Sequence, residues 1–220
     1  MIIIDIISII IFSYCAFYIA YYIFFTIAGR LVKPREINDY KMAPGSIAVL
    51  IPAYKEDSVI VDTVEKNLSQ NYPGENWKII VIADSLKAET VQRLQKLPII
   101  TVVVDFEISR KAKAINAALL QIPNFDYIVI LDADNVMGSD FLYKVNERLS
   151  AGAVAIQGHR TAKNNENSMA VLDGISEEIN NHIFRYGQTV VGLSSALIGS
   201  GMAFQFEYYK SINSGVDDIW

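Results

Sequence analysis

Two aspartates separated by one alanine, Asp132 and Asp134, follow a short apolar run. Side chains at i and i+2 of a strand point the same way, so the two carboxylates could share a hard divalent cation or divide between a cation and a sugar hydroxyl. A calcium loop of the EF-hand kind is excluded, because Met137 replaces the glycine at its sixth position and Tyr143 the glutamate at its twelfth. The alternative is that the aspartates cap a helix beginning near Ser139.

A basic group, Arg110, Lys111 and Lys113, precedes this pair and is expected to open a helix. The backbone N–H groups and the dipole at a helix N-terminus favour an anion, so a diphosphate would fit there. Lys113 and Asn116 are three residues apart and would share one helix face. The alternative is a basic face that is simply solvated.

Other catalytic patterns are missing from the sequence. It contains no phosphate-binding P-loop motif, no complete dinucleotide fingerprint and no nucleophile elbow. His159 and His182 have no spacing that suggests zinc, and the single Cys15 excludes an internal disulfide and a cysteine-ligated metal. The net charge of −5 gives no reason to expect a nucleic-acid partner, which would need a basic surface.

The elements that must position these residues alternate between strand and helix patterns. Continuous apolar runs separated by helical spacing predict an α/β domain, with a mostly parallel sheet and helices on both faces. Ligands of such sheets bind beyond the carboxyl ends of the strands, where the acidic and basic groups lie. Apolar residues at intervals of three and four, from Leu172 to Tyr186, predict an amphipathic helix. The predicted strands are Ile47 to Ile51, Lys78 to Ala83, Ile99 to Val104 and Tyr127 to Leu131.

The N-terminal segment differs from the rest of the chain, because Asp5 is its only charged residue before Arg30. As a helix, Ile6 to Ala28 would be roughly 34 Å long at about 1.5 Å per residue, enough to span a hydrocarbon core of about 30 Å. The alternatives are a buried helix of a soluble protein and a cleaved signal peptide. Signal peptides begin with basic residues, whereas here Arg30, Lys33 and Arg35 follow the apolar run.

We therefore predict three segments: an uncleaved transmembrane anchor over residues 1–29, a linker over 30–46, and the α/β domain over 47–220. The linker is indicated by Pro34, Pro44 and Gly45 among polar residues. Because Lys and Arg are enriched on the cytoplasmic flank of membrane helices, we expect a single-pass membrane protein whose domain is cytoplasmic.

Taken together and in this order, the motifs resemble those of family-2 glycosyltransferases of the GT-A fold, the membrane-associated kind that builds extracellular or capsular polysaccharide. The resemblance covers Ile47 to about Lys210, and the ordered set is more specific than any single motif. The matching segments are Ile51-Pro52-Ala53-Tyr54-Lys55-Glu56, Ala83-Asp84-Ser85, Lys111-Ala112-Lys113-Ala114-Ile115-Asn116, Asp132-Ala133-Asp134, Gln157-Gly158 and Gly199-Ser200-Gly201-Met202-Ala203-Phe204.

The resemblance implies transfer of a sugar, with inversion, from a nucleotide sugar to a glycan or polysaccharide acceptor. The donor is commonly a UDP-sugar, and the cofactor would be Mg²⁺ or Mn²⁺, held by Asp134. The implied nucleoside-pocket residues are Pro52, Ala53, Tyr54, Glu56 and Asp84. Those implied along the ribose, diphosphate and sugar are Lys113, Asn116 and Asp132, and those bordering the acceptor are Gly199, Ser200 and Gly201.

The C-terminal part departs from the family pattern. An inverting transfer needs a carboxylate that takes the proton of the acceptor hydroxyl, and Asp218 of the Asp217-Asp218 pair is the candidate base. This pair follows Gly201 by only 16 to 17 positions, and the later membrane helices of the processive members are absent, so we expect an incomplete domain. The alternative to an enzyme is a membrane-anchored nucleotide-sugar binding module or an inactive remnant. A sugar-nucleotide pyrophosphorylase would show a Gly-rich loop after its first strand, which this sequence lacks.

Overall fold

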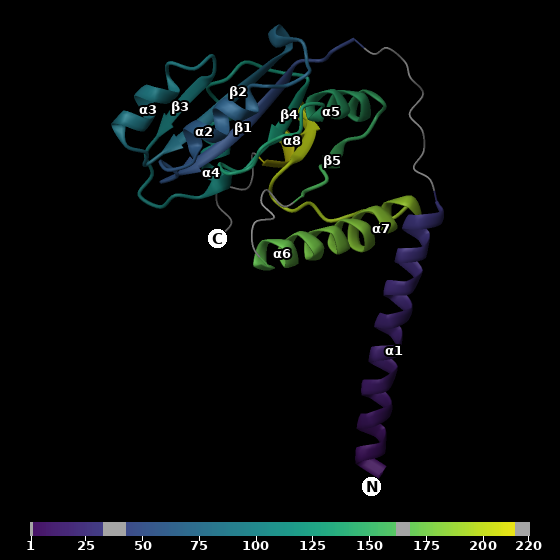
Figure 1. The fold of residues 1–220 in the computed structure, drawn as a ribbon. Helices are drawn as coiled ribbons and strands as arrows, with labels where there is room; N and C mark the ends of the chain where they lie inside the picture. Colours follow the sequence, from purple (N-terminus) through teal and green to yellow (C-terminus); the bar gives the residue numbers. More distant parts are fainter. Residues whose placement is uncertain (1, 33–42, 162–167, 214–220) are drawn as a thin grey trace. The chain divides into compact units, whose positions relative to one another are not determined.

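The structure is a computed structural model that describes residues 2–32, 43–161 and 168–213. It divides into two compact units. One comprises helix α1 (Ile2–Leu31) with the segment His159–Ala196, and the other comprises a six-stranded sheet with the helices packed on it (Figure 1).

The sheet has the strand order β3-β2-β1-β4-β6-β5. Strands β1 to β4 are parallel, whereas β6 runs antiparallel to both β4 and β5. This mostly parallel sheet confirms the predicted fold class, and all four predicted strands are present. The two short antiparallel strands were not predicted. The strands are β1 (Ile47–Tyr54), β2 (Trp77–Asp84), β3 (Ile100–Val104), β4 (Tyr127–Ile130), β5 (Ala155–Gln157) and β6 (Met202–Gln205).

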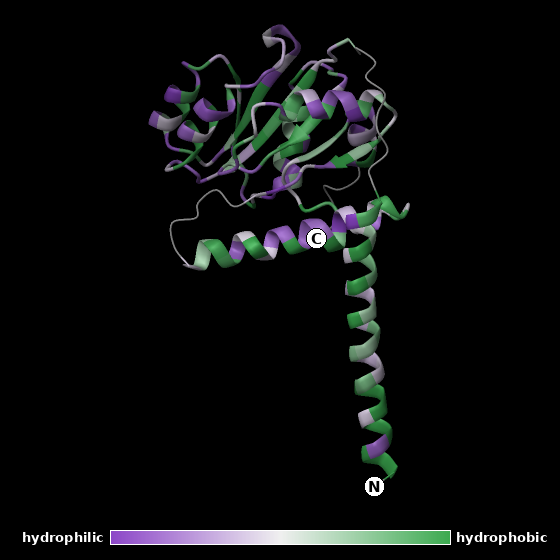
Figure 2. Cartoon of the chain, turned by 45° about the vertical axis from the view of Figure 1, so that its right-hand side comes forward, coloured by the Kyte–Doolittle hydropathy of each residue, from purple (hydrophilic) through white to green (hydrophobic). Residues whose placement is uncertain are grey.

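Burial on both faces explains why the central strands are continuous apolar runs. Ile47, Val49 and Ile51 of β1 belong to the core on one face of the sheet, and Ala48 and Leu50 belong to the core on the other. All five are fully buried. Because successive side chains alternate between the faces, one strand fills both cores, and the sheet interior is hydrophobic in Figure 2.

Helices cover both faces of the sheet, as predicted. Val64 of α2, Leu94 of α3 and Leu142 of α5 pack into the first core. Ala118 of α4 and Phe206 of α8 pack into the second. The helices of this unit are α2 (Ile60–Asn67), η1 (Gly74–Asn76), α3 (Ala88–Leu94), α4 (Lys111–Leu119), α5 (Phe141–Ser150) and α8 (Phe206–Asn213).

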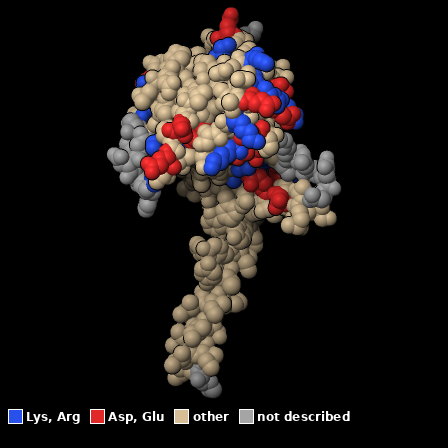
Figure 3. Space-filling view, turned by 90° about the vertical axis from the view of Figure 1, so that its left-hand side faces the viewer, with Lys and Arg blue, Asp and Glu red and all other residues tan. Residues whose placement is uncertain are grey.

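The other unit consists of helices. α6 (Ser168–Ile179), the π-helical η2 (Asn180–Tyr186) and α7 (Gly187–Val190) follow one another, which confirms the predicted amphipathic helix. Among the described residues, α1 is the one helix that is long and apolar enough to cross a membrane. Its visible surface in Figure 3 carries no charged side chains over most of its length.

Candidate functional site

The neighbouring strands β1 and β2 end at the same level of the sheet. Tyr54 is paired with Asp84, and the residue after each of them, Lys55 and Ser85, has a positive φ of 58° and 54°. Such left-handed backbone is uncommon for residues other than glycine. Here it turns the backbone sharply at the ends of β1 and β2. The turns are joined by a hydrogen bond of 3.1 Å from the Lys55 N–H to the Asp84 carbonyl.

Asp84 is 1% exposed, and both of its carboxylate oxygens accept hydrogen bonds from hydroxyls. The Ser85 hydroxyl lies 3.0 Å from Oδ1, and Ser109, in the segment that follows β3, donates to Oδ2. Asp84 therefore ties the segment between β3 and α4 to the end of β2. Its expected role toward the base or ribose stays a prediction.

The segment at the end of β1 carries the other residues expected at the nucleoside. Ala53 is buried, Pro52 is half-buried, and Tyr54 and Glu56 are exposed. The Lys55 ammonium lies 4.9 Å from the centroid of the Tyr54 ring, and its hydrogen bond with Tyr54 raises the pKa of Lys55. An exposed aromatic ring beside a cation suits the stacking of a nucleobase next to a phosphate.

Asp57 anchors the same segment to the start of α3. Its Oδ1 accepts hydrogen bonds from the Thr90 hydroxyl at 2.6 Å and from the Lys87 N–H at 2.9 Å. The Thr90 hydroxyl, and then the Lys87 N–H, hold the pKa of the Asp57 carboxyl below its ordinary value. Hydrogen-bond donors directed at a carboxylate favour its ionised form. The link between this segment and α3 therefore depends on ionised Asp57.

Asp132 meets a cation at the end of β4. The Lys111 ammonium lies 2.5 Å from Asp132 Oδ1 and 2.6 Å from the carbonyl oxygen of Gly199. The Lys111 and Asp132 side chains are 41% and 42% exposed, so solvent reaches this ion pair. Lys111 thus bridges the segment after β4 and the glycine-rich segment before β6.

Ser200 also links the glycine-rich segment before β6 to the segment after β4. It has no exposed surface, and its hydroxyl oxygen accepts hydrogen bonds from the Asp132 N–H at 2.9 Å and the Asn135 side-chain amide at 2.6 Å. Gly199 and Gly201 have φ values of 86° and 66°, which glycine adopts at little cost. The Gly-Ser-Gly segment therefore holds the backbone that carries Asp132.

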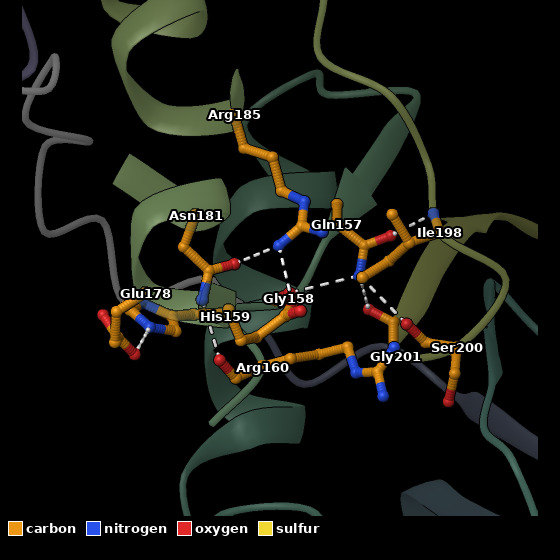
Figure 4. A network of polar contacts seen from close by, with 11 residues as sticks. Gln157, Gly158, His159, Arg160, Glu178, Asn181, Arg185, Ile198, Ser200 and Gly201 are labelled. Carbon is orange, nitrogen blue, oxygen red and sulfur yellow. Dashed lines mark hydrogen bonds and ion pairs between the residues drawn. The ribbon is translucent and has the colours of Figure 1, made fainter. Parts of the chain in front are cut away.

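Gln157 at the end of β5 fixes the other side of this segment (Figure 4). Its Oε1 accepts a hydrogen bond of 2.9 Å from the Ile198 N–H, and its Nε2 donates to the carbonyl oxygen of Ser200 at 2.9 Å. The Gly158 N–H donates to the Gly201 carbonyl at 2.7 Å. The Gln-Gly and Gly-Ser-Gly motifs thus form one hydrogen-bonded unit, a relation that the sequence motifs did not specify.

Asn67, which the sequence did not single out, supports the segment after Asp134. It is fully buried in α2, accepts a hydrogen bond from the Met137 N–H at 2.7 Å and donates to the Asn135 carbonyl at 2.9 Å. A lone asparagine in an otherwise amphipathic helix gives no sequence signal of such a contact.

The structure places Lys113 and Asn116 differently from Lys111. The Lys113 ammonium lies 4.5 Å from the centroid of the Phe106 ring, and Asn116 hydrogen-bonds Asn213 of α8. Their expected roles along the diphosphate stay untested, and Lys111, which lies next to Asp132, is the alternative lysine for that role. The signal that could have indicated Lys111 is its position as the first residue of α4, the helix that follows β3.

Asp134 is exposed in the segment after β4, and its expected role as a metal ligand stays a prediction. The described part of the chain holds no group of three or more His, Cys, Asp or Glu side chains that could cage a metal. Asp132 and Asp134 are donors of the kind that Mg²⁺ uses, because this ion binds one or two carboxylates and completes its shell with water and substrate phosphates. The residue that precedes α5 is Asp140, so neither Asp132 nor Asp134 occupies the capping position of that helix. Asp132 instead forms an ion pair with Lys111. The candidate base Asp218 lies outside the described residues.

The fold is similar to that of solved glycosyltransferases. The mannosyltransferase PcManGT from Pyrobaculum calidifontis, in complex with GDP-Man and Mn²⁺, superposes with a TM-score of 0.72 at 20% identity, covering 93% of this chain and 57% of that one. Glucosyl-3-phosphoglycerate synthase from Mycobacterium tuberculosis, in complex with Mn²⁺, UDP and phosphoglyceric acid, gives a TM-score of 0.49 at 18% identity, covering 74% and 56%. The chain thus spans a little over half the length of these proteins.

The similarity to PcManGT agrees with the GT-A fold that the sequence motifs implied. No match was found among curated proteins. The sequence model of the family described as "Glycosyltransferase like family 2" matches residues 44–218, which include the whole sheet and every residue of the site described above. The chain therefore belongs to glycosyltransferase family 2.

Proposed function

We propose that the chain transfers a sugar, with inversion, from a nucleotide sugar to a glycan or polysaccharide acceptor. The observation that carries this proposal is the position of Lys111, between Asp132 and the carbonyl of Gly199. It puts a cation, a carboxylate and a glycine-rich backbone together beyond the carboxyl ends of parallel strands, where ligands of such sheets bind. The complex of PcManGT with GDP-Man supports a nucleotide-sugar donor, and the resemblance of the motifs favours a UDP-sugar.

The donor would lie across the ends of β1, β2 and β4. Its base and ribose would lie against Pro52, Ala53, Tyr54 and Glu56, with Asp84 at the end of β2 as a hydrogen-bond partner of the base or ribose. Its diphosphate would meet Lys111, which is held in place in this structure by two oxygen acceptors that a phosphate can replace. A lysine suits this task because its ammonium is a compact charge on a flexible stem.

Asp134 would hold Mg²⁺ or Mn²⁺, with Asp132 close by in the same segment. When bound, the metal neutralises the negative charge that develops on the leaving nucleoside diphosphate. The presence of Mn²⁺ in the PcManGT complex supports this choice of cofactor.

The acceptor would lie beside Gly199, Ser200 and Gly201. In an inverting transfer its hydroxyl oxygen forms a bond to the anomeric carbon while the bond from that carbon to the diphosphate breaks. The hydroxyl proton goes to a carboxylate, for which we propose Asp218. Such a general base contributes about 10²- to 10⁴-fold to the rate.

Helix α1 would anchor the chain in the lipid bilayer, with the sheet-bearing unit in the cytoplasm. The length and apolar character of α1 and the basic residues after it support this proposal. Protease added to intact cells should leave the sheet-bearing unit uncut. Digestion from outside would contradict the orientation.

The metal site is tested by calorimetry with UDP and Mn²⁺ on the full chain in detergent micelles. Asp134→Asn should lose most of the metal-dependent affinity, because an amide is a weaker metal ligand than a carboxylate. The matched control is Asp62→Asn, which alters an exposed ion pair on α2 and should bind as the parent does. Equal binding by Asp134→Asn with and without a chelator would favour a structural role for this aspartate.

Turnover distinguishes an enzyme from a binding module. The full chain, incubated with a UDP-sugar and Mn²⁺, should release UDP, and Asp218→Asn should slow that release if the acceptor is present. Binding of UDP-sugar without release would favour the binding module.

A further inference from the structure

Helices α6, η2 and α7 form one continuous segment that lies across the end of α1 in the same unit (Figure 1). Gly187 permits the contact, because a Cβ there would lie 2.5 Å from the Phe25 carbonyl oxygen. The Gln188 side-chain amide donates to the Tyr21 hydroxyl at 2.6 Å. His182 Nε2 lies 3.1 Å from the Thr26 carbonyl oxygen. The transverse segment is therefore fastened to the last turns of α1.

The position of this contact relative to the bilayer follows from the proposed anchoring of the chain by α1, on which the inference rests. Thr26 lies near the C-terminal end of the apolar run, and Arg30 follows it one turn later. Where a run of this length spans a bilayer, its ends reach the boundary between hydrocarbon and headgroups. A segment fastened across that end therefore lies at the level of the headgroups.

One face of the transverse segment is apolar and exposed. Leu172, Ile175 and Ile179 recur at intervals of three and four and are 58%, 52% and 49% exposed. Residues at this spacing share one side of a helix, and Figure 2 shows hydrophobic and hydrophilic residues alternating along it. Among the described residues, no protein contact covers these three side chains to the extent seen in the core.

Two residues of the apolar face, Ile175 and Ile179, line a hollow that α1 also borders. This open hollow of about 790 Å³ lies in the angle between the two helices. Thr26 of α1 and Thr161 line it together with residues of α6 and η2, which are mostly apolar but include Glu178 and His182. The apolar face of α6 thus borders the C-terminal part of α1.

The opposite face is polar and internally paired (Figure 4). The Arg185 guanidinium lies 2.8 Å from the Glu177 carboxylate and also donates to the Asn181 side chain. The Asn181 amide donates to the carbonyl of Arg160 at 2.7 Å. These contacts hold the helix in a fixed rotation about its axis, with the apolar face directed away from them.

We infer that α6 and η2 form an amphipathic helix that lies in the lipid interface, with Leu172, Ile175 and Ile179 buried among the acyl chains of the membrane that α1 crosses. Amphipathic helices of this kind bury their apolar face at the boundary between headgroups and acyl chains. This segment carries more acidic than basic residues, namely Asp173, Glu177 and Glu178 compared with Arg185 alone. Its attachment therefore depends on apolar burial and not on anionic lipids.

The test places nitroxide labels on single cysteines of the full chain, reconstituted in phosphatidylcholine vesicles. Labels at Leu172, Ile175 and Ile179, each in a Cys15→Ser background, should collide with oxygen several-fold more, relative to a water-soluble nickel chelate, than a label at Asp173. Oxygen concentrates in the acyl chains, whereas the chelate stays in water. Adding phosphatidylglycerol to the vesicles should leave the ratios unchanged.

The native Cys15 separates this inference from the anchoring itself, because it lies in α1. A label on Cys15 that meets oxygen and not the chelate shows that α1 is inserted. If that result is accompanied by free access of the chelate to Ile175, the interfacial helix is refuted while the anchor stands. Labels on α6 that are shielded from both reagents, and that become accessible on dilution of the protein in lipid, would show contact with a second copy and would also refute it.

Discussion

The sheet has two halves that reach the site in different ways. In the parallel half, β1, β2 and β4 are buried on both faces, and the site residues lie at the end of each strand or just after it. In the antiparallel half, β5 and β6 have three and four residues, and the site backbone is held by the side chains of Gln157 and Ser200. Apolar burial thus positions one side of the site, and hydrogen bonds position the other.

Substitutions in the two halves of the sheet should therefore have different effects on stability and on donor binding. Loss of apolar volume in the parallel half weakens the whole fold, because its strands fill both cores. Loss of one hydrogen bond in the antiparallel half displaces a few residues that face the donor. Stability and donor binding should therefore separate between the two halves.

The largest effect on stability is expected in the parallel half. Leu50→Ala removes a fully buried side chain in the centre of β1 and should lower the free energy of unfolding by about 2–5 kcal/mol, because a cavity remains. Urea unfolding of the full chain in micelles, followed by tryptophan fluorescence, measures it. Leu120→Ala is the control, since Leu120 is 85% exposed and its truncation should change little. Equal effects of the two variants would contradict the assignment of the core.

An intermediate effect is expected in the antiparallel half. Ser200→Ala leaves the Asp132 N–H and the Asn135 amide without their acceptor, which should cost about 1–3 kcal/mol of unfolding free energy. UDP affinity should fall in the same variant, measured by calorimetry under conditions where the protein stays folded. The exposed Ser139→Ala serves as the control. A variant that is destabilised but binds UDP normally would show that Ser200 supports the fold alone.

Much of the parallel half could be predicted from the sequence. Continuous apolar runs mark strands that are buried on both faces, and the polar residues directly after them, such as Asp84 and Asp132, mark the edge where the site forms. The amphipathic helix from Leu172 to Tyr186 was equally visible, because its apolar residues recur with helical spacing.

The antiparallel half was not predictable by the same means. β5 and β6 have only two and three apolar residues before a glutamine, too few to stand out as an apolar run. The Gln157 and Asn67 contacts join residues 41 and more positions apart. The sequence also did not indicate that Lys111, and not Lys113, contacts Asp132. Spacing along a helix shows which residues share a face, but not which face meets the neighbouring strand ends.

The smallest effect is expected at the half-buried Asp57, which links the end of β1 to the start of α3. The Thr90 hydroxyl and the Lys87 N–H lower the pKa of Asp57 in the folded chain. A group of this kind stabilises the fold above its unfolded-state pKa, and the contribution is lost as the pH falls through its folded-state pKa. Asp57→Ala should therefore lower the urea midpoint more at a pH of about 7 than at a pH of about 3. The exposed Glu75→Gln is the control, and an Asp57→Ala effect that is the same at both pH values would contradict this link.

The central claim is that the donor binds where the two halves meet, at Lys111. The most direct measurement compares the UDP affinity of Lys111→Met and Lys113→Met in the full chain with saturating Mn²⁺. Lys111→Met should weaken binding about tenfold or more, as expected for the loss of a charge-assisted hydrogen bond, whereas Lys113→Met, whose ammonium lies over Phe106, should stay within about twofold of the parent. Unchanged affinity in Lys111→Met, or a larger loss in Lys113→Met, would contradict the account.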